Sequence, residues 1–298
     1  MCSYNPALVA ALVRAGAGST VQVSRNAGIG ICYMGQFLEQ TAVMPSAEGT
    51  WAGEIHRGWR IGSVANGGYV LALVGRALSA ALSQPDPLSI NAFYLAPCEL
   101  GPVQIAVESL SETRSTHFAS ADLRQNGQLK LRATAAYTNL DKLSGPDWSN
   151  VTPPDVPPFD TVAGLAASHL EIHQRVDLRL VHGHEVFSEG STDGSGEFVA
   201  WLAHRDGTAP DPIDLLMFAD ILPPPVFTIY GAYGWAPTVE LTVQVRRKPA
   251  AGPLLARHAT KHVSHGVAET DTEIWDCEGH LVSIARQTYK LRMPKTDQ

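Results

Sequence analysis

The stretch NGGYVLALVGRALSAAL, residues 66–82, is the most informative part of the chain, because it predicts a helix without a polar face. Asn66 is a residue type that favours the N-cap position of a helix, and Tyr69–Leu82 is apolar almost throughout. A helix that is hydrophobic on all sides has to be buried by other elements. We therefore expect this helix to lie at the centre of a core.

The sequence after this helix predicts the sheet that buries it. Four runs are typical of strands, and Asn126-Gly127 between the last two strongly favours a tight hairpin turn. The predicted strands are Ser89–Leu95, Val103–Glu112, Ser115–Gln125 and Gln128–Thr138. An antiparallel sheet curled around the helix would cover its apolar surface.

Landmarks of this first half recur in the same order roughly 150 residues later, which indicates an internal duplication. The matching landmarks are Gly101-Pro102 with Gly252-Pro253, Leu129 with Leu281, and Tyr137 with Tyr289.

The second half follows a proline-rich stretch, residues 146–158, which we interpret as a linker or a wrapping loop. Asp211-Pro212 predicts a second helix with an N-cap aspartate and a proline at its first position, and this helix would end at the prolines 223–225. The predicted strands are Gln174–Leu180, Glu197–His204, Thr238–Arg247, Leu254–Ser264, Val267–Asp276 and His280–Arg292.

Two units, each with a helix followed by antiparallel strands, make an α+β fold. We predict two antiparallel sheets, each wrapped around a buried helix and joined side by side, so that two sheet edges are covered. The first unit would span residues 34–145, the linker 146–170 and the second unit 171–298.

Residues 1–33 differ in character from the rest. We expect them to be a disordered extension, or the product of a start codon chosen upstream of Met34, with the folded part beginning near Phe37. The piece Gly28-Ile29-Gly30 lacks the third glycine and the following helix of a dinucleotide-binding site.

The composition excludes several classes of protein. The 29 acidic residues outnumber the 22 Lys and Arg, and the resulting net charge of −7 argues against nucleic-acid binding. No apolar run reaches the roughly 20 residues of a membrane span. The four cysteines form no C-x-x-C pair, so neither a disulfide scaffold nor a zinc ribbon is indicated. We expect a globular protein of the cytoplasm.

Several motifs, taken in order, make the chain resemble the double-hotdog acyl-CoA thioesterases, the group that contains bacterial thioesterase II. The resemblance extends from Met34 to Arg292, and it depends on the order and spacing of the motifs together. The motifs are Asn66-Gly67-Gly68-Tyr69, Ile90–Pro97, Arg114–Ala121, Gln125–Gln128, Phe218–Pro224, Pro237–Glu240 and Ile284–Gln287.

The resemblance implies a double hotdog fold and a thioesterase of lipid and fatty-acid metabolism that hydrolyses acyl-CoA by water attack. It implies no metal or redox cofactor, with coenzyme A entering as part of the substrate, and a homo-oligomer. The family's catalytic Asp, Thr and Gln fall on Asp220, Thr238 and Gln287. Related enzymes can have a histidine where this chain has Asn91.

Two of these residues are notable in their own right. Asp220 lies in the apolar run Leu215–Leu222, where desolvation would raise its pKa and suit it to act as a base, although it could instead cap an exposed helix end. Gln287 shares a predicted strand face with Tyr289 and replaces Ala135 of the first half. A buried amide must be hydrogen-bonded, so Gln287 holds either a water molecule or the backbone.

Thr238 heads a predicted strand whose odd-numbered residues, Val239 onward, would face the buried helix. Thr238 would then face solvent or a cleft, together with Glu240, a second candidate base.

The predicted helix begins with Asn66, Gly67 and Gly68, and the free amides at its N-terminus suit the binding of an oxyanion. The alternative is that the two glycines only allow the helix to pack closely against the sheet.

Other patterns are less informative. There is no G-x-S-x-G nucleophile motif, and the two histidine groups, His182 with His184 and His258 with His262 and His265, lack the companions of a zinc site. The basic run Arg246–Lys248 could bind the phosphates of coenzyme A, but a solvated loop is the better interpretation.

Two other functions remain open. A non-catalytic acyl-CoA or lipid-binding protein would bind acyl-CoA without releasing thiol. An enoyl-CoA hydratase would need an Asp-x-Asn-Pro-x-His motif, which the chain lacks.

Overall fold

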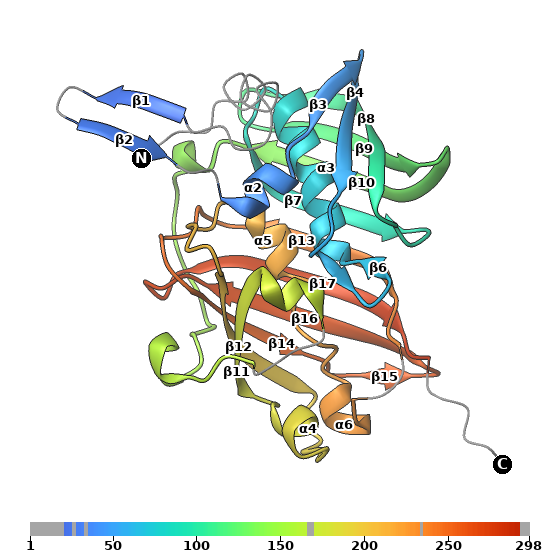
Figure 1. The fold of residues 1–298 in the computed structure, drawn as a ribbon, viewed down its shortest axis with the longest axis vertical. Coiled ribbons are helices and arrows are strands. Elements are labelled where there is room, and N and C mark those ends of the chain that lie inside the picture. Colours follow the sequence, from blue (N-terminus) through green and yellow to red (C-terminus); the bar gives the residue numbers. More distant parts are fainter. Residues whose placement is uncertain (1–20, 26–27, 33–34, 166–169, 233–234, 293–298) are drawn as a thin grey trace.

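A computed structural model describes residues 21–25, 28–32, 35–165, 170–232 and 235–292 (Figure 1). Its main feature is one antiparallel sheet of 13 strands. The strands are β3 (Met44–Ala47), β4 (Thr50–Ile55), β7 (Asp86–Tyr94), β8 (Gly101–Glu112), β9 (His117–Gln125), β10 (Gln128–Thr138), β11 (Val176–His182), β12 (Glu197–His204), β13 (Thr238–Val245), β14 (Leu254–Ala259), β15 (Val263–Ser264), β16 (Val267–Trp275) and β17 (Leu281–Lys290).

The strand order is symmetrical about the pair formed by β7 and β13. From β7 outward the sheet continues through β10, β9, β8, β4 and β3, and from β13 outward through β17, β16, β14, β12 and β11, while β15 pairs with β16. This symmetry confirms the internal duplication. The predicted pair of sheets is one continuous sheet, because β7 and β13 hydrogen-bond directly, with Thr242 opposite Asn91. In Figure 1 the C-terminal half (yellow to red) lies below the N-terminal half.

The predicted apolar helix is α3 (Gly67–Ala81), and it is buried over most of its length. Asn66 is confirmed as its N-cap, since its side-chain oxygen accepts a hydrogen bond from Tyr69 N at 2.9 Å. The remaining short helices are α2 (Gln36–Gln40), α4 (Glu185–Ser188), α5 (Asp214–Phe218) and α6 (Phe227–Tyr230). The chain also forms three short 3₁₀ helices, which are η1 (Leu140–Lys142), η2 (Phe159–Thr161) and η3 (Glu171–Gln174). A small separate hairpin consists of β5 (Arg60–Ile61) and β6 (Val64–Ala65).

The second predicted helix is much shorter than expected. α5 begins at Asp214 instead of Pro212 and ends at Phe218, five residues before the first proline of the predicted stop. The N-cap of α5 is Ile213 and not the predicted Asp211, which lies in the turn before the helix, where its Oδ1 accepts hydrogen bonds from Ile213 N at 2.7 Å and Asp214 N at 3.0 Å. The helix therefore covers less of its sheet than α3 does.

The amino-terminal prediction needs a correction. Before Phe37 the chain forms a hairpin of β1 (Val21–Arg25) and β2 (Gly28–Cys32), which includes the glycine piece at 28–30. The sequences VQVSR and GIGIC alternate in the way that favours paired strands. Residues 1–20, 26–27 and 33–34 lie outside the described part of the chain.

The proline-rich stretch wraps over the C-terminal half of the sheet, since Trp201 Nε1 donates to the Pro157 carbonyl oxygen at 2.9 Å. Two residues of the basic run that follows β13 form ion pairs. Arg247 lies 3.0 Å from Asp147, and Lys248 lies 2.5 Å from Asp141. These partners come from the first half and the linker, so the run helps to join the two halves.

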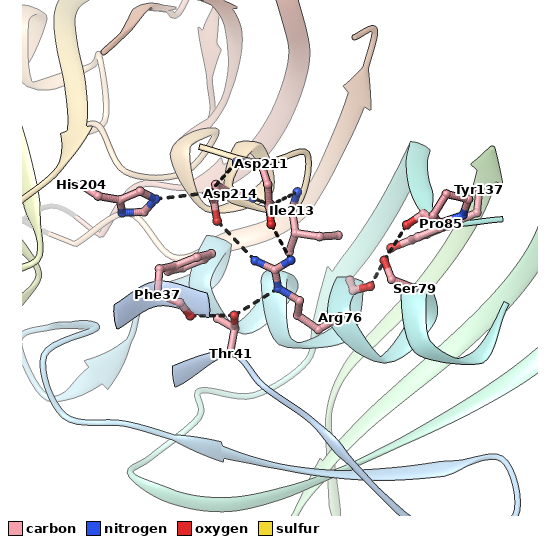
Figure 2. Close-up of polar contacts among 11 residues, drawn as sticks. Phe37, Thr41, Arg76, Ser79, Pro85, Tyr137, His204, Asp211, Ile213 and Asp214 are labelled. Carbon is pink, nitrogen blue, oxygen red and sulfur yellow. Dashed lines mark hydrogen bonds and ion pairs between the residues drawn. The ribbon is translucent and has the colours of Figure 1, made fainter. Parts of the chain in front are cut away.

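A buried ionic cluster joins α3 to the start of α5 (Figure 2). Arg76 reaches from α3 to Asp211 at 2.7 Å and to Asp214 at 3.5 Å. His204 Nε2 lies 3.4 Å from the other oxygen of Asp214, and its ring stacks on Phe37. The cluster fixes the two helices whose ends carry the candidate site described below.

Within the described ranges, no helix is both long and apolar enough to cross a membrane.

Candidate active site

The three residues that the resemblance selects lie together in the structure. Gln287 on β17 donates hydrogen bonds from Nε2 to Asp220 Oδ1 at 2.7 Å and to Thr238 Oγ1 at 2.5 Å. Asp220 comes two residues after α5, and Thr238 opens β13. One amide therefore links a turn and two strands that are far apart in the sequence.

The other carboxylate oxygen of Asp220 faces the N-terminus of α3. Oδ2 accepts from Gly68 N at 2.9 Å and from Asn66 Nδ2 at 3.1 Å. Asn66 Nδ2 also donates to the Asp220 carbonyl oxygen at 2.9 Å. The positive end of the helix dipole and its free N–H groups thus stabilise the ionised form of Asp220.

Burial has the larger effect on Asp220. Protein atoms crowd the carboxyl group, and this desolvation raises the pKa of Asp220 to about 6, although hydrogen bonds from Gly68, Gln287, Gly67 and Asn66 act in the opposite direction. The residue keeps part of its surface accessible. Asp220 is therefore ionised near neutral pH and able to take up a proton.

A β-bulge corrects the predicted face of Thr238. Thr238 pairs with Tyr289 and Glu240 with Thr288, so Val239 has no partner on β17. Val239 is 36% exposed, whereas the simple alternation had predicted it to face the buried helix. The extra residue turns Thr238 to the inner side of the sheet, where Gln287 lies, and bulges often re-aim a side chain in this way.

Glu240, the alternative base, lies on the other face of the sheet. Thr242 Oγ1 donates to Glu240 Oε1 at 2.5 Å, and Asn91 Nδ2 donates to both side chains. Asn91 and Glu240 therefore form a separate polar cluster on the seam between β7 and β13.

The glycine pair allows α3 to approach α5 closely. A Cβ on Gly68 would lie 2.7 Å from the Met217 carbonyl oxygen, and one on Gly67 would lie 2.9 Å from Asp220 Oδ2. The Gly68 amide is bonded to Asp220 in this structure, so its predicted part in binding an oxyanion stays a prediction.

Gly68→Ala is expected to destabilise the protein by about 1–3 kcal/mol, because the added methyl group meets backbone that cannot move aside easily. Denaturant unfolding at pH 7 measures this loss. Gly53→Ala is the matched control, since a Cβ there would meet its neighbours at 3.4 Å, which is ordinary packing. Equal unfolding midpoints for the two variants would contradict the expectation.

Tyr94 is a residue near the site to which the sequence analysis gave no role. Its hydroxyl donates to the Gly67 carbonyl oxygen at 3.0 Å. The alternation of side chains along the strand could have predicted that Tyr94 points inward. Tyr94 lies two residues after the buried Ala92 and therefore shares its face of the sheet.

Across the described ranges, no three His, Cys, Asp or Glu side chains are grouped so as to hold a metal ion. Of the two histidine groups in the sequence, His258 is buried in β14 with its Nδ1 2.7 Å from Thr272 Oγ1, and His182 lies 3.3 Å from Asp193.

Comparison with solved structures shows the fold. A candidate thioesterase II from Thermobifida fusca is 28% identical, with a TM-score of 0.80 over 88% of this chain and 99% of that chain. A protein of unknown function with a hot dog fold from Alicyclobacillus acidocaldarius is 23% identical, with a TM-score of 0.79 over 88% and 100%. The acyl-CoA thioesterase II TesB2 of Mycobacterium marinum is 17% identical, with a TM-score of 0.69 over 87% and 99%.

Sequence comparison gives the family. An uncharacterised protein of Mycobacterium tuberculosis is 25% identical over an alignment of 261 positions that covers 79% of this chain and 88% of that protein. The family model for the acyl-CoA thioesterase N-terminal domain matches residues 55–138, and the model for the C-terminal domain matches residues 151–289. The two matches cover most of the chain and both halves of its duplication, and the chain therefore belongs to the acyl-CoA thioesterase family.

Proposed function

We propose that this protein hydrolyses acyl-CoA thioesters to the free acid and coenzyme A. The observation that supports this most directly is the Gln287 amide, which joins Asp220 and Thr238 beside the N-terminus of a buried helix. This arrangement offers a base of raised pKa together with polar groups that can orient a water molecule.

In the proposed reaction, Thr238 and Gln287 orient a water molecule and Asp220 removes its proton. The water oxygen bonds to the thioester carbonyl carbon and gives a tetrahedral oxyanion. The carbon–sulfur bond then breaks, the carbonyl re-forms, and the proton held by Asp220 passes to the departing thiolate of coenzyme A. No metal or redox cofactor takes part, and coenzyme A enters only as part of the substrate.

The helix N-terminus has two tasks in this scheme. Before the reaction the Gly68 amide stabilises the ionised carboxylate of Asp220. When Asp220 takes up the proton, the hydrogen bond from the Gly68 N–H to its carboxyl group weakens. The amides of Gly67 and Gly68 can then stabilise the developing oxyanion. The apolar acyl tail lies along the buried helices, because ligand sites of this kind are mostly apolar.

A free-thiol release assay with acyl-CoA substrates from acetyl to palmitoyl, together with benzoyl-CoA, tests the proposal. Thiol release by the wild type, lost in Gln287→Ala, would support hydrolysis and define the range of acyl groups. Tight binding of acyl-CoA without any thiol release would instead indicate a lipid-binding protein.

The activity is expected to depend on pH through Asp220. The pKa of about 6 means that kcat/KM stays level above pH 7 and falls tenfold per pH unit well below 6, because the protonated carboxyl cannot accept the proton of water. Initial rates between pH 4.5 and 8.5 at constant ionic strength measure this fall in kcat/KM, the acidic limb of the pH profile. A profile that is flat across this range would contradict the role of Asp220 as base.

A further inference from the structure

Tyr94 ends β7, beside the seam between the two halves, and reaches the first turn of α3. Its hydroxyl donates a hydrogen bond to the Gly67 carbonyl oxygen at 3.0 Å. The ring packs closely on the same residue, since a Cβ on Gly67 would lie 3.0 Å from Tyr94 Cε1. Tyr94 therefore contacts the peptide group that joins Gly67 to Gly68.

This peptide group links Tyr94 to the candidate base. Its oxygen accepts from Tyr94, and its N–H, that of Gly68, donates to Asp220 Oδ2 at 2.9 Å. A peptide group is planar, so a bond that fixes its oxygen also fixes the direction of its N–H. Donation to the oxygen also polarises the N–H, and this strengthens its bond to the carboxylate.

The helix does not need the hydrogen bond from Tyr94. In an α-helix the carbonyl of residue i accepts from the N–H of residue i+4, so the Gly67 carbonyl has a partner inside α3. A carbonyl oxygen has a second lone pair, and the Tyr94 hydroxyl uses it. This additional bond is directed at the peptide group whose N–H, that of Gly68, donates to Asp220 Oδ2 at 2.9 Å.

We propose that Tyr94 is a positioning residue of this site: through the Gly67–Gly68 peptide, its hydroxyl holds in place the N–H that stabilises the ionised carboxylate of Asp220. The consequence for turnover rests on the proposed function. The consequence for the ionisation of Asp220 does not, and it can be measured without substrate.

The titratable neighbours do not compete for this role. Burial and the nearby Asp220 raise the pKa of Tyr94 well above its usual value, so the hydroxyl remains a donor at any working pH. Burial raises the pKa of Cys98, which also lies near Tyr94, to about 11, so Cys98 remains a thiol. Glu240, the other acidic group near Tyr94, is held by Asn91 and Thr242.

Tyr94→Phe tests the proposal, and Tyr137→Phe is a matched control. Tyr137 also donates its hydroxyl to a carbonyl of α3, that of Gly75 at 2.9 Å. Gly75 lies about two helical turns beyond Gly67. We expect Tyr94→Phe to lower kcat/KM about 3- to 10-fold and to move the acidic limb of its pH profile upward. Tyr137→Phe is expected to leave that limb where it is.

A ¹³C NMR titration of protein labelled at the aspartate carboxyl carbons follows Asp220 directly, and its resonance is identified by its absence from Asp220→Asn. A higher titration midpoint in Tyr94→Phe, with no change in Tyr137→Phe, supports the proposal. An unchanged midpoint in Tyr94→Phe, or an equal shift in both variants, overturns it. If the midpoint shifts but the wild type releases no thiol, the proposed function fails while the positioning role stands.

Discussion

Asp220→Asn is expected to lower kcat/KM for acyl-CoA by about a thousandfold, within the 10²–10⁴ that a positioned general base contributes. The substitution keeps the shape of the side chain but removes its ability to take a proton from water. Thiol release from the most reactive acyl-CoA of the panel, compared with the uncatalysed rate, measures the loss. A variant that is folded and hydrolyses acyl-CoA at the wild-type rate would exclude Asp220 as the base.

Asparagine is the suitable replacement because it leaves the surrounding hydrogen bonds nearly intact. Its oxygen can still accept from Gly68 N, and the Gln287 amide can turn so that its own oxygen accepts from the new NH₂ group. The matched control is Glu240→Gln, which removes the other nearby carboxylate, on the far face of the sheet. We expect this control to retain activity, and a thousandfold loss in it as well would point to Glu240 instead.

Arg76→Met is expected to cost about 3–5 kcal/mol of folding free energy, the range found when one partner of a buried ion pair is removed. The guanidinium is 4% exposed and Asp214 is 5% exposed, so the variant leaves a buried carboxylate without its cationic partner on α3. Asp211, also released, lies beside Asp214 and adds repulsion, since the two acidic groups share this cluster. Guanidinium chloride unfolding measures the difference.

An exposed ion pair serves as the control for this experiment. Arg132 forms a 2.7 Å ion pair with Asp122, but its side chain is 59% exposed. Arg132→Met is therefore expected to destabilise the protein far less than Arg76→Met does, because water solvates the charge that remains. The expectation for Arg76 fails if the two variants unfold at the same denaturant concentration.

Because Arg76 joins α3 to α5, we also expect its variant to lose activity at temperatures where it is still mostly folded.

Local patterns in the sequence sufficed for most of the secondary structure. β10 and β12 have the predicted bounds, Gln128–Thr138 and Glu197–His204, since alternation and the Asn126-Gly127 turn are properties of neighbouring residues. The strands β3 and β4 were not predicted. They lie at the outer edge of the sheet, where the alternation between buried and exposed residues is weak.

The candidate site was predicted residue by residue, but its geometry was not. Asp220, Thr238 and Gln287 were selected by resemblance, and Gln287 also by its replacement of an alanine in the duplication. Alternation gave the wrong face for Val239, because a bulge depends on how β13 pairs with β17 and leaves little trace in composition.

The sequence by itself determined that the chain is a duplicated α+β unit with a buried helix, since apolar periodicity and repeated turns follow from the order of residues along the chain. Only the tertiary structure decided which groups meet. Gly68 and Asp220 are 152 residues apart, and Arg76 and Asp211 are 135 apart. The desolvation that raises the pKa of Asp220, and the amide that opposes it, arise when α3, α5 and β17 pack together. That packing depends on contacts between distant segments, which no local pattern specifies.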